Sequence, residues 1–409
     1  MKASLFYLAA ALVVFLTGGH LYAQGGLVPA GTPGPQMKSL QQIWDLLETQ
    51  QAQISTLEAE AAQHQASLVS LGTALGLQTR DLFELQTVDA TANVGLYNSL
   101  AYGPDGRPAI AYYDSDNDDL KFARFNGSSW TIQVIDSAGD VGKYASLRFG
   151  ADGQPAIAYW DDTSDDLKFA RFNGTSWNLE TVDAAGIVGT YASLAFAPNG
   201  DPSIAYVDSS NASAIKFARF NGVSWAIGNV GTTGTRLSLA FGPGGLPAIS
   251  YVNLGFVRIA RFDGAIWTFQ PVENNPSGTT SLAFGVDGQP AIAYGRADGG
   301  GPGSYDMKVA RYNGTTWSPQ IVDLSSSENP ALKFDPNGLP AISYSDITSS
   351  DLKSARYNGT TWRVDPVDTE VAPGILSSLA FAPDGRPAIS YYSGVSLRFA
   401  RATGAGFNP

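Results

Sequence analysis

From residue 83 onward the chain consists of short runs in which apolar and polar residues alternate, divided by turn-forming residues. In residues 146–183 the runs "SLRFG", "PAIAYW", "LKFARF" and "WNLETVD" are separated by "ADGQ", "DDTSDD" and "NGTS". Alternation with period two is typical of half-buried strands, and Gly, Asn and Asp favour the turns between them. This unit is therefore predicted to form four short antiparallel strands, A to D.

The four-strand pattern occurs seven times. Each unit starts near a leucine: Leu100, Leu147, Leu194, Leu239, Leu282, Leu332 and Leu379, at intervals of 47, 47, 45, 43, 50 and 47 residues. Repeated four-stranded units of this length predict an all-β fold, a seven-bladed β-propeller, in which circular closure protects the sheet edges.

The two ends of the repeat region complement each other. The seventh unit stops at "FARATGAGFNP", without a strand D, whereas "FELQTVDATANVGLYNSL" (83–100) matches "WNLETVDAAGIVGTYASL" (177–194). We therefore expect the first strand of the propeller domain, residues 82–409, to complete the last blade.

Residues 39–79 carry a heptad pattern in which eight of the twelve a and d positions are Leu or Ile. This indicates an α-helical coiled-coil stalk that oligomerises the protein, with a trimer favoured. The alternative is a single amphipathic helix lying on its own domain. His64 at a d position is interpreted as a polar core layer, with a pH switch as the alternative.

The residues before the heptad indicate export. Residues 1–23 combine Lys2, an apolar run from Leu5 to Phe15 and a cleavage site after Ala23, as in a signal peptide, and a Gly/Pro-rich linker spans 24–38. After cleavage no membrane span is expected. The predicted location is secreted, cell-surface or periplasmic, in a bacterium.

Composition restricts the chemistry. The chain has 25 Lys+Arg against 37 Asp+Glu, no cysteine, and only two histidines, both before residue 80. The acidic balance argues against nucleic-acid binding, which requires clustered basic residues. A propeller without His or Cys has no Ser-His-Asp triad, thiol nucleophile or His-ligated metal, so no enzyme activity and no catalytic residue is predicted. A glycosidase acting through two carboxylates is the alternative.

The nonapeptide "FARFNGSSW" (122–130) and its variants recur at the C–D turn. We interpret its tryptophans and arginines as structural, the tryptophans filling the gap between blades and the arginines pairing with aspartates of the A–B turns. The tryptophans are Trp130, Trp177, Trp225, Trp267, Trp317 and Trp362, and the arginines are Arg124, Arg171, Arg219, Arg261, Arg311, Arg356 and Arg401. Ligand binding by the arginines is the alternative.

These motifs carry a resemblance. The "NGxxW" turn is similar in position to the Asp-box hairpin of sialidase-type propellers, although Ala123 and Phe125 replace its Ser and Asp. The pattern "IAYYD…LKFARFNGSSW" resembles the repeats of fungal fucose lectins and bacterial seven-bladed propeller lectins over residues 83–409. That resemblance implies sugar binding between neighbouring blades.

The face carrying the B–C and D–A loops differs most between blades, and it combines carboxylates with aromatic rings. Rings beside carboxylates suit carbohydrate, whose C–H faces stack while its hydroxyls form hydrogen bonds. The candidate ligand-binding residues are Tyr97, Tyr113, Asp114, Tyr144, Trp160, Asp161, Tyr191 and Asp208. A solvated acidic rim is the alternative.

No cofactor is expected, with one alternative. "DSDNDD" (114–119) lacks the Gly and Glu of an EF-hand, but Asp114, Asp116 and Asp118 form a candidate calcium site. The sequence thus predicts an exported, multivalent lectin-like head whose partner is a glycan or a surface protein. Alternatives are a protein-binding scaffold and a sialidase-like enzyme.

Overall fold

The computed structural model describes residues 45, 47–50, 52–53, 56, 82–297, 305–325, 327–369 and 376–404. The chain divides into two units, residues 1–75 and 76–409. In the first, the described residues are helical, and the hydroxyls of Thr49 and Thr56 donate to the carbonyls of Asp45 and Ala52, 2.8 and 2.9 Å away. The predicted signal peptide, linker and remaining heptad positions lie outside the described residues.

No helix within the described residues is long and apolar enough to cross a membrane.

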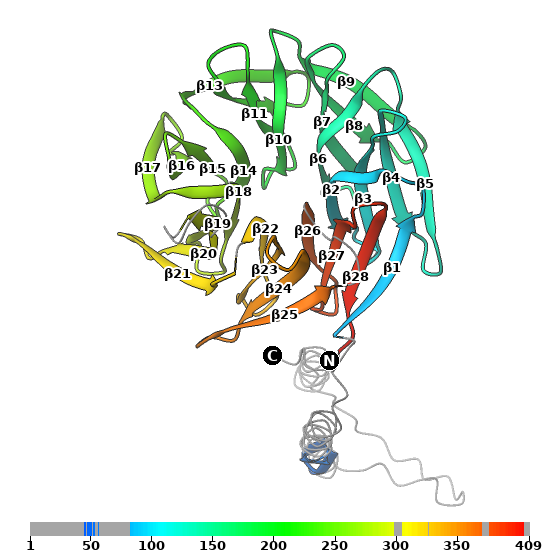
Figure 1. The fold of residues 1–409 in the computed structure, drawn as a ribbon, viewed down its shortest axis with the longest axis vertical. Coiled ribbons are helices and arrows are strands. Elements are labelled where there is room, and N and C mark those ends of the chain that lie inside the picture. The colour runs from blue at the N-terminus through cyan, green and yellow to red at the C-terminus, as the bar shows by residue number, and fades with distance from the viewer. Residues whose placement is uncertain are drawn as a thin grey trace, which may run out of the picture. The chain divides into compact units, whose positions relative to one another are not determined.

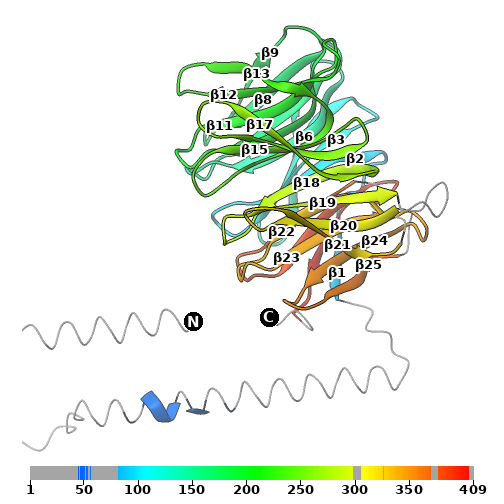
Figure 2. The ribbon, with the colours of Figure 1, turned by 90° about the vertical axis from the view of Figure 1, so that its left-hand side faces the viewer.

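The second unit is a ring of seven antiparallel four-stranded sheets, which confirms the predicted seven-bladed β-propeller (Figure 1). The first strand of each sheet contacts the first strand of the next, so these seven strands surround the centre. Figure 2 shows the ring turned by 90°, with neighbouring blades stacked one over the next. The B–C and D–A loops lie on one face, and the A–B and C–D turns on the other, because adjacent strands are antiparallel.

The first three blades are close copies of one another. Blade one comprises β2 (Val94–Tyr102), β3 (Pro108–Asp114), β4 (Asp119–Phe125) and β5 (Trp130–Asp136). Blade two comprises β6 (Val141–Phe149), β7 (Pro155–Asp161), β8 (Asp166–Phe172) and β9 (Trp177–Asp183). Blade three comprises β10 (Val188–Phe196), β11 (Pro202–Asp208), β12 (Ala214–Phe220) and β13 (Trp225–Thr233).

The next three blades follow the same plan. Blade four comprises β14 (Thr235–Phe241), β15 (Pro247–Asn253), β16 (Phe256–Phe262) and β17 (Trp267–Asn274). Blade five comprises β18 (Pro276–Phe284), β19 (Pro290–Ala297), β20 (Tyr305–Tyr312) and β21 (Trp317–Asp323). Blade six comprises β22 (Ser327–Phe334), β23 (Pro340–Asp346), β24 (Asp351–Tyr357) and β25 (Trp362–Asp368).

Blade seven closes the ring in the predicted way. It comprises β26 (Ser377–Phe381), β27 (Pro387–Tyr392), β28 (Leu397–Ala402) and, on its outer edge, β1 (Phe83–Asp89). β1 pairs with β28 from Phe83 opposite Ala402 to Asp89 opposite Leu397. Backbone hydrogen bonds between the two ends of the repeat region therefore hold the ring shut.

Apolar packing joins neighbouring blades. One core cluster combines Phe122 and Val141 with Ile157 and Tyr159, so it spans blades one and two. The ring of Trp177 in blade two meets Phe122 of blade one edge-on, with centroids 5.1 Å apart. Each tryptophan-bearing strand thus contributes a large ring to the space between blades, where aromatic side chains bury the most apolar area.

A buried or half-buried carboxylate that contacts a tyrosine and a cation also links most blades; we call this group a carboxylate joint. Between blades one and two, the hydroxyl of Tyr159 and the ammonium of Lys168 each lie 2.7 Å from Asp136 Oδ2. Asp136 is 5% exposed, so its carboxylate belongs to the interior of the joint. The equivalent groups are Tyr112, Asp89 and Lys121; Tyr206, Asp183 and Lys216; Tyr294, Glu273 and Lys308; Tyr344, Asp323 and Lys353; and Tyr391, Asp368 and Arg398.

The pKa values of the joint carboxylates reflect this bonding. Burial alone would raise the pKa of Asp136, but the hydrogen bonds from Lys168 and Tyr159 outweigh it, and the pKa lies below the ordinary value. The pKa values of Asp89, Asp183 and Asp323 are lowered in the same way. These aspartates are therefore ionised throughout the neutral range. The interface between blades three and four differs, because Gly231 stands where the other interfaces have a carboxylate.

Candidate functional site

The repeated arginines lie on the A–B-turn face, where they hold turns and neighbouring blades. Arg124 Nη2 lies 2.5 Å from Asp105 of its own blade, and its guanidinium stands 4.8 Å from the ring centroid of Phe149 in the next blade. Arg171, Arg311 and Arg401 pair at 2.8 Å with Asp152, Asp287 and Asp384, and Arg219 and Arg356 lie 3.6 Å from Asp201 and Asp365. Arg261 instead covers the ring of Tyr312 at 4.2 Å.

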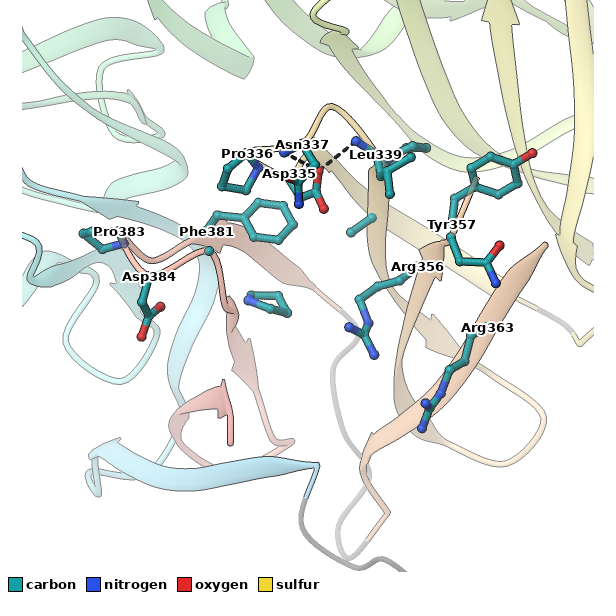
Figure 3. A pocket seen from close by; sticks show the side chains of 15 residues that line it. Asp335, Pro336, Asn337, Leu339, Arg356, Tyr357, Arg363, Phe381, Pro383 and Asp384 are labelled. Atoms are coloured by element: carbon teal, nitrogen blue, oxygen red, sulfur yellow. Dashed lines mark hydrogen bonds between the residues drawn. The ribbon is translucent and has the colours of Figure 1, made fainter. Parts of the chain in front are cut away.

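Clefts between blades open on the same side as these arginines. The cleft between blades six and seven has a volume of about 550 Å³ and is lined by Arg356, Arg363, Phe381 and Asp384, among others. Figure 3 shows Phe381 and Arg356 entering it from neighbouring blades, with Asp335 hydrogen-bonded to the backbone of its own turn. Equivalent clefts hold Arg124 (about 250 Å³) and Arg219 (about 380 Å³). These are the inter-blade positions at which the lectin resemblance implies sugar binding.

Three of the predicted ligand-binding aspartates lie inside the blades. Asp114, Asp161 and Asp208 are 0%, 4% and 6% exposed. Asp114 accepts hydrogen bonds from the backbone of Asp116 and the side chain of Asn117, and Lys121 pairs with it at 2.6 Å. These buried carboxylates stabilise the blades and the B–C loops, and they are not accessible to a ligand on the surface.

The calcium hypothesis for Asp114, Asp116 and Asp118 requires correction, because the three carboxylates do not converge. Asp114 pairs with Lys121, Asp116 Oδ1 accepts from Asn93 at 2.9 Å, and Asp118 Oδ1 accepts from the hydroxyl of Tyr113 at 2.6 Å. Within the described ranges, no three acidic or histidine side chains gather to hold a metal ion. Residues 115–118 form a turn, and the three carboxylates are each bonded to a different neighbour.

The five predicted aromatic residues do come together, on the B–C-loop face; we call Tyr97, Tyr113, Tyr144, Trp160 and Tyr191 the aromatic cluster. The ring centroids of Tyr97 and Tyr144 are 4.7 Å apart, and those of Tyr144 and Tyr191 are 4.8 Å apart. Tyr113 packs beside Tyr97 at 6.2 Å and Trp160 beside Tyr144 at 6.1 Å. Except for Tyr113, which is buried, all are partly exposed.

An irregularity of the inner strands positions the three central tyrosines. Tyr97, Tyr144 and Tyr191 have φ of 51°, 54° and 56°, in the left-handed region, and the pairing of each inner strand with the next strand shifts register there. A tyrosine in this conformation is an outlier, with a cost of about 1–3 kcal/mol. With this shift in register, the tyrosine rings of neighbouring blades pack against one another beside the centre of the propeller.

Lys143 connects the aromatic cluster to two carboxylates. Its ammonium lies 2.6 Å from Asp140 Oδ2, bonds also to Asp162, and stands 5.5 and 5.8 Å from the ring centroids of Tyr113 and Trp160. The hydroxyl of Tyr113 lies 2.6 Å from Asp118 and 2.8 Å from Asp140, so its single proton serves two carboxylates. The aromatic cluster is therefore bordered by one ammonium group and by carboxylates, all on the B–C-loop face.

The protonation states suit polar recognition at neutral pH. Burial raises the pKa of Tyr97 and of Tyr144, and for Tyr144 the neighbouring tyrosines raise it further. Burial lowers the pKa of Lys143, but its bonds to Asp140 and Asp162 outweigh this, and the net pKa is raised. The phenols therefore remain hydrogen-bond donors and Lys143 remains charged.

Sequence reasoning missed Lys143, Asp140 and Asp162 as members of this site. Lys143 precedes Tyr144, at the position where the other two close copies have Leu96 and Thr190. This difference between otherwise similar repeats was the sequence signal that could have marked Lys143 as a site residue. Lys143 bonds to Asp140 of a D–A loop and to Asp162 of a B–C loop. The approach of these two loops depends on the tertiary structure, so the spacing of residues along the sequence does not reveal it.

Comparison with known proteins supports the fold. No protein-family description and no curated sequence matches the chain. Among solved structures, a PL25 ulvan lyase is similar over 77% of this chain and 95% of its own, with 14% identity and a TM-score of 0.56. YCF48 bound to D1 peptide is similar over 80% and 98%, with 17% identity and a TM-score of 0.53.

Propeller lectins are also among the neighbours. The lectin of Aleuria aurantia, in complex with a fucosylated GlcNAc, is similar over 69% of this chain and 98% of its own, with 16% identity and a TM-score of 0.44. The chain is a seven-bladed β-propeller whose structural neighbours include fucose-binding lectins, a polysaccharide lyase and a peptide-bound propeller.

Proposed function

We propose that this protein binds carbohydrate through the aromatic cluster. The observation that carries the proposal is the placement of Tyr97, Tyr144 and Tyr191 at a strained position that does not require tyrosine. Blades four and six keep the left-handed backbone there, with φ of 63° and 54°, but use Arg236 and Asn329. Strain maintained in a partly exposed row of rings is typical of a functional surface.

The chemistry of the surface matches a sugar. The rings offer apolar faces against which the C–H groups of a pyranose pack. The phenol hydroxyls both donate and accept, while Lys143, Asp140 and Asp162 supply a donor and acceptors for hydroxyl groups at the rim. A neutral or weakly polar sugar unit is the ligand class that this mixture of groups fits.

We further propose that the protein acts by binding and not by catalysis. The carboxylates beside the aromatic cluster are already bonded to Lys143 and Tyr113, an arrangement that suits holding a ligand better than supplying the free acid and nucleophile of glycoside hydrolysis. The apolar stretch near the N-terminus and the heptad at 39–79 support export and clustering through a helical stalk, trimeric in the favoured form, which would raise avidity for weak sites.

A glycan array probed with the full-length protein tests the proposal. We expect wild-type protein to bind a defined subset of glycans, and Tyr144→Asn, which introduces the residue of blade six, to weaken that binding by about tenfold. Arg363→Ala is the matched control, because Arg363 is 52% exposed and lines the cleft of Figure 3.

The outcomes separate the candidates. Loss of binding in Arg363→Ala but not in Tyr144→Asn would move the sugar site to the inter-blade clefts. Absence of glycan binding in wild-type protein would refute the proposal and favour the second candidate, a protein-binding scaffold, as the propeller of the peptide-bound neighbour suggests.

A further inference from the structure

The inner strands of the blades surround a central channel, and a ring of serine side chains lies along it. In six of the seven blades, a serine on the inner strand accepts a hydrogen bond from the backbone N–H of the repeat leucine in the next blade. The distances are 2.9–3.0 Å for Ser99, Ser146, Ser193, Ser238, Ser281 and Ser378. Each hydroxyl keeps its own proton to donate. Five of these serines line a channel of about 380 Å³.

Two cations enter this channel from different blades. The residue after the repeat leucine is alanine in five blades: Ala101, Ala195, Ala240, Ala283 and Ala380. In blades two and six the same position holds Arg148 and Lys333, and both line the channel. Because five blades form the same inner strand with alanine, the fold does not require a charge at this position.

Within the described residues, neither cation is compensated by a carboxylate. Arg148 Nη1 donates to the carbonyl of Leu147 at 2.7 Å, and no ion pair involves Arg148 or Lys333. Burial, followed by the positive charge of Arg148, lowers the pKa of Lys333 to about 7. Two like charges that line one partly enclosed channel create a positive potential that favours an anion.

We propose that the central channel binds a small oxyanion, of the sulfate or phosphate class, between Arg148 and Lys333. The guanidinium supplies fixed donors that match an oxyanion edge, and the ammonium supplies a second charge. The serine hydroxyls of the ring donate to the remaining oxygens. This site is separate from the proposed sugar surface, because it uses channel-lining residues and none of the aromatic cluster.

The test is thermal unfolding of the full-length protein at pH 6 in sodium sulfate, sodium phosphate or sodium chloride of equal ionic strength. Sulfate also stabilises proteins nonspecifically, so the informative result is a saturable rise that chloride does not reproduce. Arg148→Ala and Lys333→Ala introduce the residue of the other blades and should each raise the apparent Kd by at least about tenfold. Arg363→Ala, on the exposed rim, should leave it unchanged.

Equal stabilisation of wild type and the Arg148→Ala/Lys333→Ala double variant would overturn the proposal. If the variants fold poorly, the wild-type protein still decides the question through the ¹³Cε resonance of Lys333. Bound sulfate should raise the titration midpoint of Lys333 by about one unit, as expected for a charge partner. A midpoint that sulfate does not move would equally refute the site.

Discussion

Blades one to three share with blades four and six a left-handed residue on the inner strand, but the side chains at this position differ. The left-handed position holds Tyr97, Tyr144 and Tyr191 in the first group, and Arg236 and Asn329 in blades four and six. Arg236 donates to the carbonyl of Gly278 at 2.8 Å, so it serves a neighbouring blade. The comparison teaches that the left-handed backbone is common to five blades and accepts other residues, whereas the tyrosines belong to a surface confined to three blades.

Blades one to three meet the other blades at two interfaces, and the one between blades three and four lacks a carboxylate joint. Tyr206 of blade three donates to Asp183 at 2.6 Å, whereas Tyr251 of blade four has Gly231 at the corresponding position. Apolar packing that includes Tyr251, Leu239 and Val230 joins blades three and four, together with hydrogen bonds between uncharged groups such as that from the Leu239 N–H to Ser193. Within the described residues, a carboxylate joint is therefore present at six interfaces and replaced by uncharged contacts at this one.

The largest expected effect is acid destabilisation of four of the six jointed interfaces, those that contain Asp89, Asp136, Asp183 and Asp323. The pKa values of Asp89, Asp136, Asp183 and Asp323 lie below the ordinary 3.8 in the folded state. A lowered folded pKa contributes stability that is present above 3.8 and is lost as the pH falls through the folded value. Urea unfolding should therefore show a steep loss of stability below about pH 4. A flat profile between pH 5 and pH 3 would contradict the role of the joints.

Removal of one joint comes next. Asp136→Ala leaves Lys168 and Tyr159 without their shared partner and should lower the free energy of unfolding by about 3–5 kcal/mol. Urea denaturation at pH 7 measures this change. As matched controls, Tyr159→Phe should destabilise by about 1.5–3 kcal/mol, and Tyr251→Phe, which removes a hydroxyl that faces no carboxylate, by less. Equal losses of stability in Tyr159→Phe and Tyr251→Phe would contradict the idea that the carboxylate joint stabilises its interface more than the uncharged contacts between blades three and four do.

Replacing the three tyrosines of blades one to three by asparagine, the residue that blade six has at this position, tests whether the rings serve binding or stability. The triple variant Tyr97→Asn/Tyr144→Asn/Tyr191→Asn should remain folded, because asparagine favours the left-handed region, while glycan affinity falls by at least about 100-fold. Circular dichroism and titration with the array-selected glycan measure the two properties. Asn329→Tyr, the reciprocal change, should leave affinity unaltered. Unfolding of the triple variant would mean that the rings serve stability.

The smallest expected effect concerns an aspartate whose charge is unfavourable. Burial, followed by the charge of Asp114, raises the pKa of Asp119. A raised folded pKa means that ionisation at neutral pH opposes folding, so Asp119→Asn should stabilise slightly, by about 0.5 kcal/mol or less at this partly exposed position. The gain should disappear near pH 3, where the carboxyl is protonated in both states. Urea midpoints at the two pH values test this.

Much of the fold could be predicted from the sequence, and less of the site. The seven-fold spacing, the strand pattern and the match between residues 83–89 and strand D were sufficient for the propeller and its closure, because hydrophobic periodicity and turn residues are local properties. The aromatic members of the site were also visible, since the same tyrosine recurs in three units. The buried state of Asp114 and Asp161 was not, because a run of aspartates looks alike whether its carboxylates face water or a lysine.

The sequence by itself determined the number of blades, their strands and the way the ring closes, since each follows from short-range pattern repeated along the chain. Only the tertiary structure decided which charged groups share a partner. Asp136 bonds to Tyr159 and Lys168 of the next blade, and Lys143 joins Asp140 to Asp162. Arg148 and Lys333, far apart in sequence, line one channel. Circular closure brings together residues from distant repeats, and no local pattern records that proximity.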